Sequence, residues 1–263
     1  MNITKIIEDS IKKGQGTKEQ PIKIPKTLKY PILLSISAKG IKDSMKYAFK
    51  KCQEGEQQHR NHRSGGSKQR NKSEIFADAF RGKIAETGFR EFILKTKISC
   101  SPVNYSISEK GQYEVIDFVI THNNKQHSFN IKSSKIGANL CLLETKDYHT
   151  GAYKVEDGSE TPYQFIAFLK VKFNDFEPEK FILNYKNWED IEEYLKNNLL
   201  NIKCYYCGKC SWLKVQETIK NQNNDESYLK KNTYFKIINS KSNSIKMDTS
   251  NFFIHLDDFE IKN

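Results

Sequence analysis

Asp117, Asn130 and Lys132 are polar residues within two stretches that are otherwise largely apolar. Phosphodiester hydrolysis needs a hard cation, and Mg²⁺ takes oxygen ligands in octahedral geometry. Asp117 could supply a carboxylate, Asn130 a side-chain carbonyl and Ile131 its backbone carbonyl. Lys132 could orient or deprotonate the attacking water and stabilise the negative charge that develops. These residue types therefore suit metal-assisted hydrolysis.

A tight β-hairpin would bring these side chains together. The stretches around them are rich in β-branched and aromatic residues, and the intervening Asn123 and Asn124 tolerate the positive φ of a two-residue turn. Opposed residue numbers in such a hairpin sum to 247, so Asp117 lies opposite Asn130 on one face. Lys132 is two residues beyond Asn130 and projects from that same face. The spacing therefore predicts one cluster of three polar groups.

The rest of the chain predicts an α/β domain with a mixed sheet flanked by helices. The clearest helix covers 73–95, where apolar residues recur at helical spacing after Ser73, the expected N-cap. Further helices are predicted at 3–13, 41–51 and 188–200, and strands at 113–120, 126–132, 163–173, 233–238 and 252–256, while 30–37 could be a strand or the start of a helix. We expect the 73–95 helix and a later helix to flank the sheet.

Three segments, in this order along the chain, follow one pattern: GKIAETGFREF (82–92), EVIDFVI (114–120) and SFNIKSSK (128–135). The pattern resembles that of the PD-(D/E)xK nuclease superfamily, which includes many type II restriction endonucleases. That family has an acidic residue on a helix, a metal-binding Asp on a strand and a (D/E)xK motif on another strand. Carried over by position, Glu86 matches the helix acid, Asp117 the metal-binding Asp and Lys132 the catalytic Lys.

The chain departs from the family pattern at two positions. Asn130 stands where Asp or Glu is usual, and Ile116 replaces the proline that commonly precedes the metal-binding Asp. Some restriction enzymes carry an NxK variant, and residues 130–132 resemble it. A neutral carbonyl binds Mg²⁺ more weakly than a carboxylate. We therefore expect weaker metal binding, or recruitment of Glu86 as an added oxygen donor, or a protein that binds DNA without cutting it.

The resemblance implies a type II restriction endonuclease with a restriction-endonuclease-like fold. Such an enzyme cleaves double-stranded DNA at a short specific sequence with Mg²⁺ as cofactor, usually as a homodimer. Ser133, Ser134 and Lys135 follow the motif and could contact phosphate, although the polar end of a strand would look the same. Two alternatives stay open: another DNA-processing nuclease, such as a repair nickase or junction resolvase, and a non-catalytic nucleic-acid-binding protein.

Positive charge is concentrated before the 73–95 helix. Residues 1–72 hold 17 Lys and Arg and 6 Asp and Glu, a net charge of +11, while the remaining 191 residues hold 26 of each kind. A polyanionic partner would explain this, because each cation near a phosphate releases a condensed counterion; a Lys-rich solvated surface is the alternative. Residues 53–72 lack apolar side chains and predict a DNA-binding arm or a solvated loop. The arm would use Arg60, Arg63, Lys68 and Arg70.

Three regions are expected along the chain: a basic N-terminal region with its arm (1–72), a nuclease core (73–200) and a C-terminal region that could read bases (201–263). No apolar run reaches the roughly 18 residues of a membrane-spanning helix, and the N-terminal stretch lacks the apolar run of a secretory signal. Six cysteines are too few and too unevenly spaced for a disulfide scaffold. These features favour a cytoplasmic protein without membrane association.

Cys204, Cys207 and Cys210 form CYYCGKC, two overlapping CxxC units. Thiolates at this spacing could hold Zn²⁺, but a structural zinc site needs four ligands. The candidates for the fourth are Cys52, Cys100, Cys141 and His255. Free cysteines in a reducing compartment are the alternative.

Overall fold

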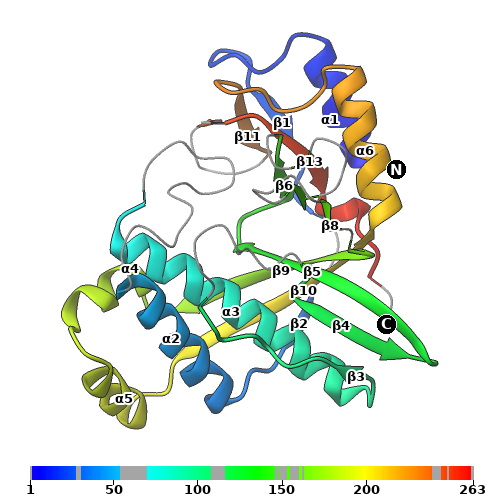
Figure 1. Ribbon diagram of the computed structural model, residues 1–263. Helices are drawn as coiled ribbons and strands as arrows, with labels where there is room; N and C mark the ends of the chain where they lie inside the picture. Colours follow the sequence, from blue (N-terminus) through cyan, green and yellow to red (C-terminus); the bar gives the residue numbers. More distant parts are fainter. Residues whose placement is uncertain are drawn as a thin grey trace.

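The computed structural model describes residues 2–27, 31–53, 70–107, 116–145, 148, 153–154, 160–161, 163–238, 244–247 and 249–261. Its largest element is a six-stranded sheet in the order β2-β10-β9-β5-β4-β3 (Figure 1). The strands are β2 (Ile32–Leu34), β3 (Ser99–Cys100), β4 (Phe118–His122), β5 (Lys125–Lys135), β9 (Phe165–Asn174) and β10 (Asn201–Ser211). β5 and β9 run parallel and the other neighbours antiparallel, which confirms the expected mixed sheet.

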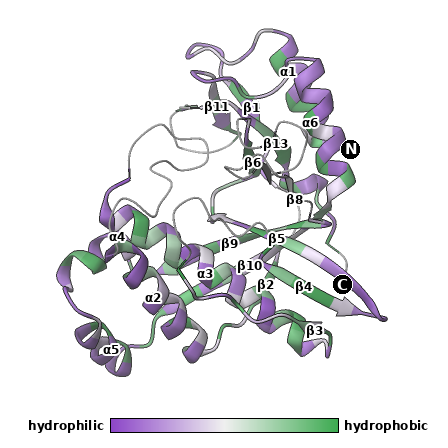
Figure 2. Ribbon diagram, in the orientation of Figure 1, coloured by the Kyte–Doolittle hydropathy of each residue, from purple (hydrophilic) through white to green (hydrophobic). Residues whose placement is uncertain are grey.

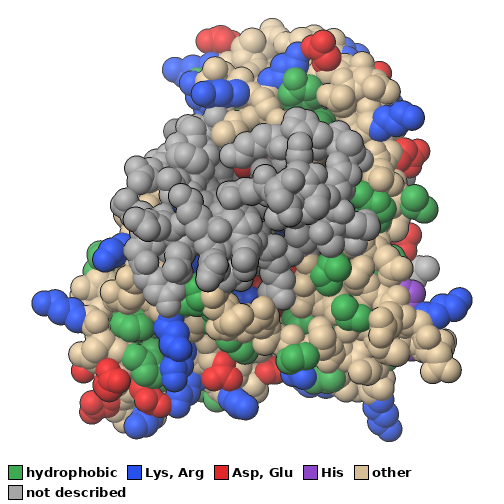
Figure 3. Space-filling view, in the orientation of Figure 1, with side chains coloured by type: hydrophobic (Ala, Val, Ile, Leu, Met, Phe, Trp, Pro, Cys, Tyr) green, Lys and Arg blue, Asp and Glu red, His purple; other side chains and the backbone are tan. Residues whose placement is uncertain are grey.

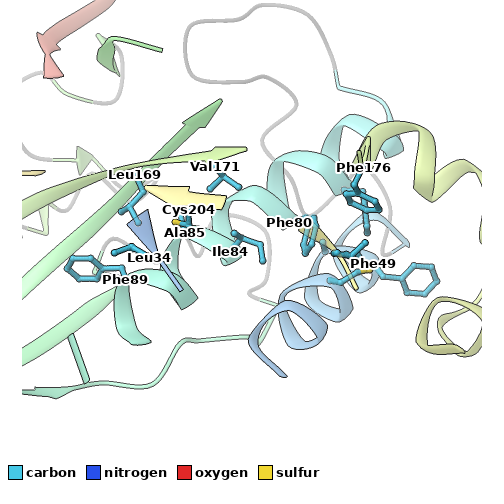
Figure 4. Packing of buried hydrophobic residues seen from close by; sticks show 14 of the residues in the cluster. Leu34, Phe49, Phe80, Ile84, Ala85, Phe89, Leu169, Val171, Phe176 and Cys204 are labelled. Carbon is cyan, nitrogen blue, oxygen red and sulfur yellow. The ribbon is translucent and has the colours of Figure 1, made fainter. Parts of the chain in front are cut away.

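The long helix α3 (Lys72–Lys95) packs against one face of this sheet, and a second long helix, α2 (Ala38–Gln53), packs against α3. Their apolar side chains form the first core cluster with the strands. Figure 4 shows Ile84 and Phe89 of α3 packed with Leu169 of β9 and Cys204 of β10. The short helices α4 (Pro178–Phe181), η2 (Ile182–Asn184) and α5 (Trp188–Asn197) extend this layer.

The N-cap of α3 is Asn71, so the expected cap at Ser73 is wrong by two residues. The Asn71 side chain accepts the Glu74 backbone N–H at 2.9 Å, and the Glu74 carboxylate accepts the Asn71 N–H at 3.0 Å. This reciprocal pair is a capping box, which satisfies two backbone donors at once. Ser73 lies within the first turn and donates its hydroxyl to Asn71 at 2.8 Å.

A second layer covers part of the opposite face. It consists of the antiparallel pair β6 (Leu140–Glu144) and β13 (Asn251–His255) together with α6 (Trp212–Asn224). Their apolar side chains form a second core cluster with Ile166 and Phe168 of β9. Helices therefore flank both faces of the sheet, but strands share the second face with α6.

The remaining elements join the two ends of the chain. α1 (Ile3–Lys12) lies near the sheet of β1 (Ile22–Ile24), β11 (Tyr234–Ile237) and β12 (Ile245–Lys246) at the top of Figure 1. Asp258, in the short helix η3 (Leu256–Asp258), accepts hydrogen bonds from the backbone N–H groups of Ile3 at 3.1 Å and Thr4 at 2.7 Å. A separate pair is formed by β7 (Tyr153–Lys154) and β8 (Glu160–Thr161).

The three regions expected along the chain share the six-stranded sheet. Residues 1–72 contribute β2, and residues 201–263 contribute β10. β1 also pairs in parallel with β11, near the other end of the chain. The expected boundaries at 72 and 200 therefore do not separate folding units, because strands distant in sequence complete the sheet. Within the described part of the chain, no helix has the length and apolar character needed to cross a membrane.

Most predicted elements are present within a few residues, but the sequence does not predict β6, β10, α6 or the short strands β1, β3, β7, β8 and β12. β10 contributes Cys204 to the first core cluster and Cys207 to the second, so its apolar residues do not alternate with polar ones. The strand also shifts register between Tyr206 and Gly208. Gly208 has φ of 124°, and a Cβ there would lie 2.8 Å from the Glu260 carbonyl oxygen, so the bulge requires glycine. Figure 2 shows how apolar residues extend over much of the sheet strands, whereas the tip of the β4–β5 hairpin is hydrophilic.

Candidate active site

The hairpin of β4 and β5 has the predicted register. Phe118 pairs with Phe129, and every pair down to the turn has residue numbers that sum to 247. Asn123 and Asn124 have φ of 50° and 58°, as both central residues of a type I′ turn require. The predicted turn is confirmed, and so is the predicted register from Phe118 to His122, but the ladder ends before the predicted pair of Asp117 and Asn130.

Asp117 lies just before β4, beyond the last recorded residue pair between β4 and β5. Its backbone N–H donates to the Phe129 carbonyl at 2.9 Å, and its carboxylate oxygen Oδ2 accepts the Ile131 N–H at 2.5 Å. The carboxylate therefore lies against the backbone of β5 at the residue between Asn130 and Lys132. Because the N–H and C=O groups of one strand residue point to the same side, the Ile131 carbonyl is directed to this edge as well.

Asn130 and Lys132 project to the face opposite α3. Their parallel partners on β9 are Ile166 and Phe168, which belong to the second core cluster. Ile131 instead packs against the first cluster. Asn130 is only 7% exposed, so its amide is held among other side chains instead of in bulk water. The hairpin thus places the Asn130 amide and the Lys132 ammonium on one face, and the Asp117 carboxylate lies beside the backbone of β5 at Ile131.

Helix α3 supplies a second carboxylate. Glu86 accepts a hydrogen bond from Lys83 Nζ at 2.6 Å, and the two side chains are 13% and 8% exposed. Burial lowers the pKa of Lys83, but Glu86, Tyr47 and Asp117 together outweigh burial, and the pKa of Lys83 is raised. These contacts favour the ammonium form of Lys83, and the pair lies on the side of α3 that approaches the hairpin.

Asp117 and Glu86 are close enough to repel each other. Burial and then the negative charge of Glu86 raise the pKa of Asp117 to about 8. The Ile131 N–H and the positive charges of Lys83 and Lys132 act in the opposite direction without cancelling this effect. The structure thus brings Glu86, Asp117 and Lys132 into one electrostatic cluster, in which a bound cation would offset the repulsion.

Tyr148 lies behind Lys132 in the second core cluster. The Lys132 Nζ is 5.6 Å from the centroid of the Tyr148 ring, and Tyr148 is buried. Burial lowers the pKa of Lys132, but the contact with Tyr148, followed by Cys141 and Asp117, outweighs it and raises the pKa. These contacts favour the ammonium form of Lys132.

Lys83 and Tyr148 are site residues that the sequence does not single out. Lys83 lies three residues before Glu86, and this spacing on a helix is a usable signal for an ion pair. Tyr148 has no comparable signal, because it is separated from Lys132 in the chain and only the packing of β6 and its neighbours brings it near.

The three residues that follow the motif, Ser133 to Lys135, do not all project to the same face of the sheet. Ser133 pairs with Leu169, a residue of the first core cluster, whereas Ser134 pairs with Lys170 and shares the face of Lys132. Lys135 is exposed and lies 4.0 Å from the Glu179 carboxylate. Only Ser134 is therefore directed to the same face as Asn130 and Lys132.

Most of the expected DNA-binding arm lies outside the described residues, including Arg60, Arg63 and Lys68. Arg70 is described, and its Nη1 lies 3.5 Å from the carboxylate of Asp78 on α3. Arg70 is therefore held by the start of the helix. Figure 3 shows the described Lys and Arg side chains spread over the upper and lower parts of the visible face, interspersed with acidic residues.

The three cysteines of CYYCGKC are not brought together. Cys204 lies in the first core cluster, and Cys207 and Cys210 lie in the second, on the other side of the sheet. Burial raises the pKa of all three thiols, to about 12, 11 and 12 respectively, which opposes the thiolate form that zinc requires. Among the residues described, no group of three His, Cys, Asp or Glu side chains could hold a metal ion. A metal at the hairpin would therefore need amide or backbone oxygens beside its two carboxylates.

Comparison with protein-family models, with curated proteins and with solved structures gives no significant match.

Proposed function

We propose that this chain is a Mg²⁺-dependent endonuclease that hydrolyses double-stranded DNA, and more specifically a type II restriction endonuclease. The observation that supports it most is the position of the Asp117 carboxylate. It is fixed by the Ile131 N–H at 2.5 Å, between Asn130 and Lys132, and Glu86 lies near enough to act on its charge. The two carboxylates and the lysine are groups that the family resemblance implies, and Asn130 supplies an amide where the family usually has a third carboxylate.

The oxygen donors suit a hard divalent cation. Asp117 and Glu86 would hold Mg²⁺ through carboxylates, with the Asn130 side-chain carbonyl and the Ile131 backbone carbonyl as neutral donors. The bound cation would supply Lewis acidity towards the scissile phosphate and acidify a water molecule. Two carboxylates with one amide give less negative charge than three carboxylates, so we expect weaker Mg²⁺ binding than at a site that has Asp or Glu in place of Asn130.

Lys132 would act as a positive charge. Its contact with the Tyr148 ring favours the ammonium, which can orient the attacking water and stabilise negative charge on the phosphate. Glu86 is already paired with Lys83. If Glu86 holds the cation, the adjacent Lys83 ammonium would offset part of the negative charge at the site.

Plasmid cleavage tests this proposal. The purified protein is incubated with supercoiled plasmid and MgCl₂, and we expect discrete double-strand fragments. Lys132→Ala removes the charge that offsets the developing phosphate charge, so cleavage should slow by about 10²–10⁴-fold. Lys196→Ala removes an exposed lysine from α5 and should cut at the wild-type rate.

The alternatives give different products. Nicked circles, or cuts confined to branched DNA, would favour a repair nickase or a junction resolvase with the same site. DNA binding without any cleavage by the wild type would contradict the nuclease proposal and favour a non-catalytic nucleic-acid-binding protein. Size-exclusion chromatography with light scattering would show whether the active species is the homodimer expected for a palindromic site.

A further inference from the structure

The central strands of the sheet carry positive charge without any negative charge. β5, β9 and β10 together contain seven lysines and no Asp or Glu. Three of these lysines, Lys170, Lys172 and Lys203, lie on the face opposite α3: Lys172 pairs with Lys203, and Lys170 lies two residues before Lys172 on β9. We call these three residues the lysine row.

Lys170 is the buried member of the lysine row. It is 4% exposed, and burial lowers its pKa, although Cys207 and Asp257 act in the opposite direction. In the described part of the structure, no hydrogen bond or ion pair reaches its ammonium group. A cation with this little water and no hydrogen-bonded carboxylate among the described residues destabilises a fold, and an anionic ligand would offset that cost.

The row is continuous with the candidate active site. On β5, Lys132 pairs with Phe168 and Ser134 pairs with Lys170, so one face carries Lys132, Ser134 and then the lysine row. Two residues along a strand correspond to about 7 Å, which places Lys170 one short step from the position of Lys132. Lys172 and Lys203 are exposed and extend the positive charge away from the site.

We propose that the lysine row binds the phosphate backbone of duplex DNA beside the scissile phosphate. The inference rests on the proposed nuclease function and adds a surface that positions the substrate. Point charges on flexible stems suit phosphates, which are contacted independently of base sequence. The lysine row fits duplex DNA better than an acidic protein, because it shares a sheet face with Lys132, which would lie beside the scissile phosphate.

The test is a salt titration of DNA binding. Affinity for a fluorescently labelled duplex is measured by anisotropy with CaCl₂ in place of MgCl₂ at several KCl concentrations. The triple variant Lys170→Gln, Lys172→Gln and Lys203→Gln should lose at least about tenfold in affinity on every duplex sequence. Its slope of log affinity against log salt should be shallower by about 3, because each lost phosphate contact removes about 0.9.

A charge-matched control separates local contacts from net charge. Lys186→Gln, Lys196→Gln and Lys220→Gln remove three exposed lysines from α5, its neighbourhood and α6, and this variant should keep the wild-type slope. Equal losses in both triple variants, a wild-type slope in the row variant, or no binding by the wild type would each overturn the inference. If the row variant does not fold, the single changes at the exposed Lys172 and Lys203 should each lower the slope by about 1.

The two proposals can fail separately. Binding that depends on the lysine row, without cleavage by the wild type in Mg²⁺, would support the row and contradict the nuclease. Cleavage together with binding that does not depend on the row would support the nuclease and overturn the row.

Discussion

The two faces of the six-stranded sheet differ in what they bury. The face towards α3 buries apolar and aromatic side chains, and Phe89 alone lies 5.9 Å from Phe118, 5.6 Å from Phe129 and 5.9 Å from Tyr206, measured between ring centroids. The opposite face buries Asn130 and Lys170 as well as apolar residues. The first face follows from the drive to bury apolar surface, whereas the second contains groups whose burial opposes folding.

This difference indicates where function lies. Buried polar and charged groups destabilise a protein unless they are compensated, and proteins keep such groups mainly at functional sites. Four polar residues lie on the face opposite α3, next to each other in the strand register: Asn130, Lys132, Ser134 and Lys170. The candidate site and the lysine row therefore share one face of the sheet, and the apolar core lies on the other face.

The largest expected effect comes from breaking the apolar face. Phe89→Ala removes a buried ring from the centre of the aromatic cluster and should lower the free energy of unfolding by about 3–5 kcal/mol. Urea denaturation followed by circular dichroism measures this change. Leu94→Ala changes an exposed residue of the same helix and should cost less than about 1 kcal/mol. Similar losses in the two variants would show that this face is not the stabilising one.

A pH-dependent effect on stability is expected at Asp117, where the two faces meet. The pKa of Asp117 rises from its ordinary value of 3.8 to about 8 on folding. The folded state therefore holds a proton that the unfolded state releases, and the stability of the metal-free protein should fall as pH rises from about 4 to 8. The slope from one such group is at most about 1.4 kcal/mol per pH unit, and Asp117→Asn should reduce it.

Urea denaturation in the presence of Mg²⁺ tests whether the cation binds at Asp117. The cation binds the ionised carboxylate, so MgCl₂ should raise the urea midpoint of the wild type most at pH 8. Asp117→Asn should abolish most of this gain, and Glu86→Gln should reduce it. A gain that is unchanged in Asp117→Asn would place the cation elsewhere.

Local rules predict much of the hairpin and of the long helices. Asn123 and Asn124 specify the turn, the turn specifies the register, and the register places Asn130 and Lys132 on one face. The 73–95 helix is predicted by its apolar spacing, although the capping box moves its N-cap to Asn71. These features depend on residues within a few positions of one another, and such short-range terms can be read from a sequence.

Features set by distant packing are not predicted. β10 joins the centre of the sheet, and its cysteines are divided between two cores, which a reading of CYYCGKC as one cluster does not anticipate. The contact of Lys132 with Tyr148 depends on chain segments that meet only in the folded protein. The burial of Lys170 is equally invisible, because a lysine in a strand is normally expected at the surface.

The smallest expected effect comes from a substitution of Lys170 that distinguishes a role in stability from a role in DNA binding. Lys170→Met keeps a long flexible side chain and removes a buried charge that no carboxylate of the described residues contacts by a hydrogen bond, so it should stabilise the protein by about 1 kcal/mol at pH 7. Because folding lowers the pKa of Lys170, the folded state binds fewer protons, and wild-type stability should rise as pH increases through that lowered pKa. The variant should lose this rise in urea titrations between pH 7 and 10. The same substitution should weaken duplex binding, and a variant that is both less stable and unchanged in binding would show that Lys170 belongs to the core, as Phe89 does.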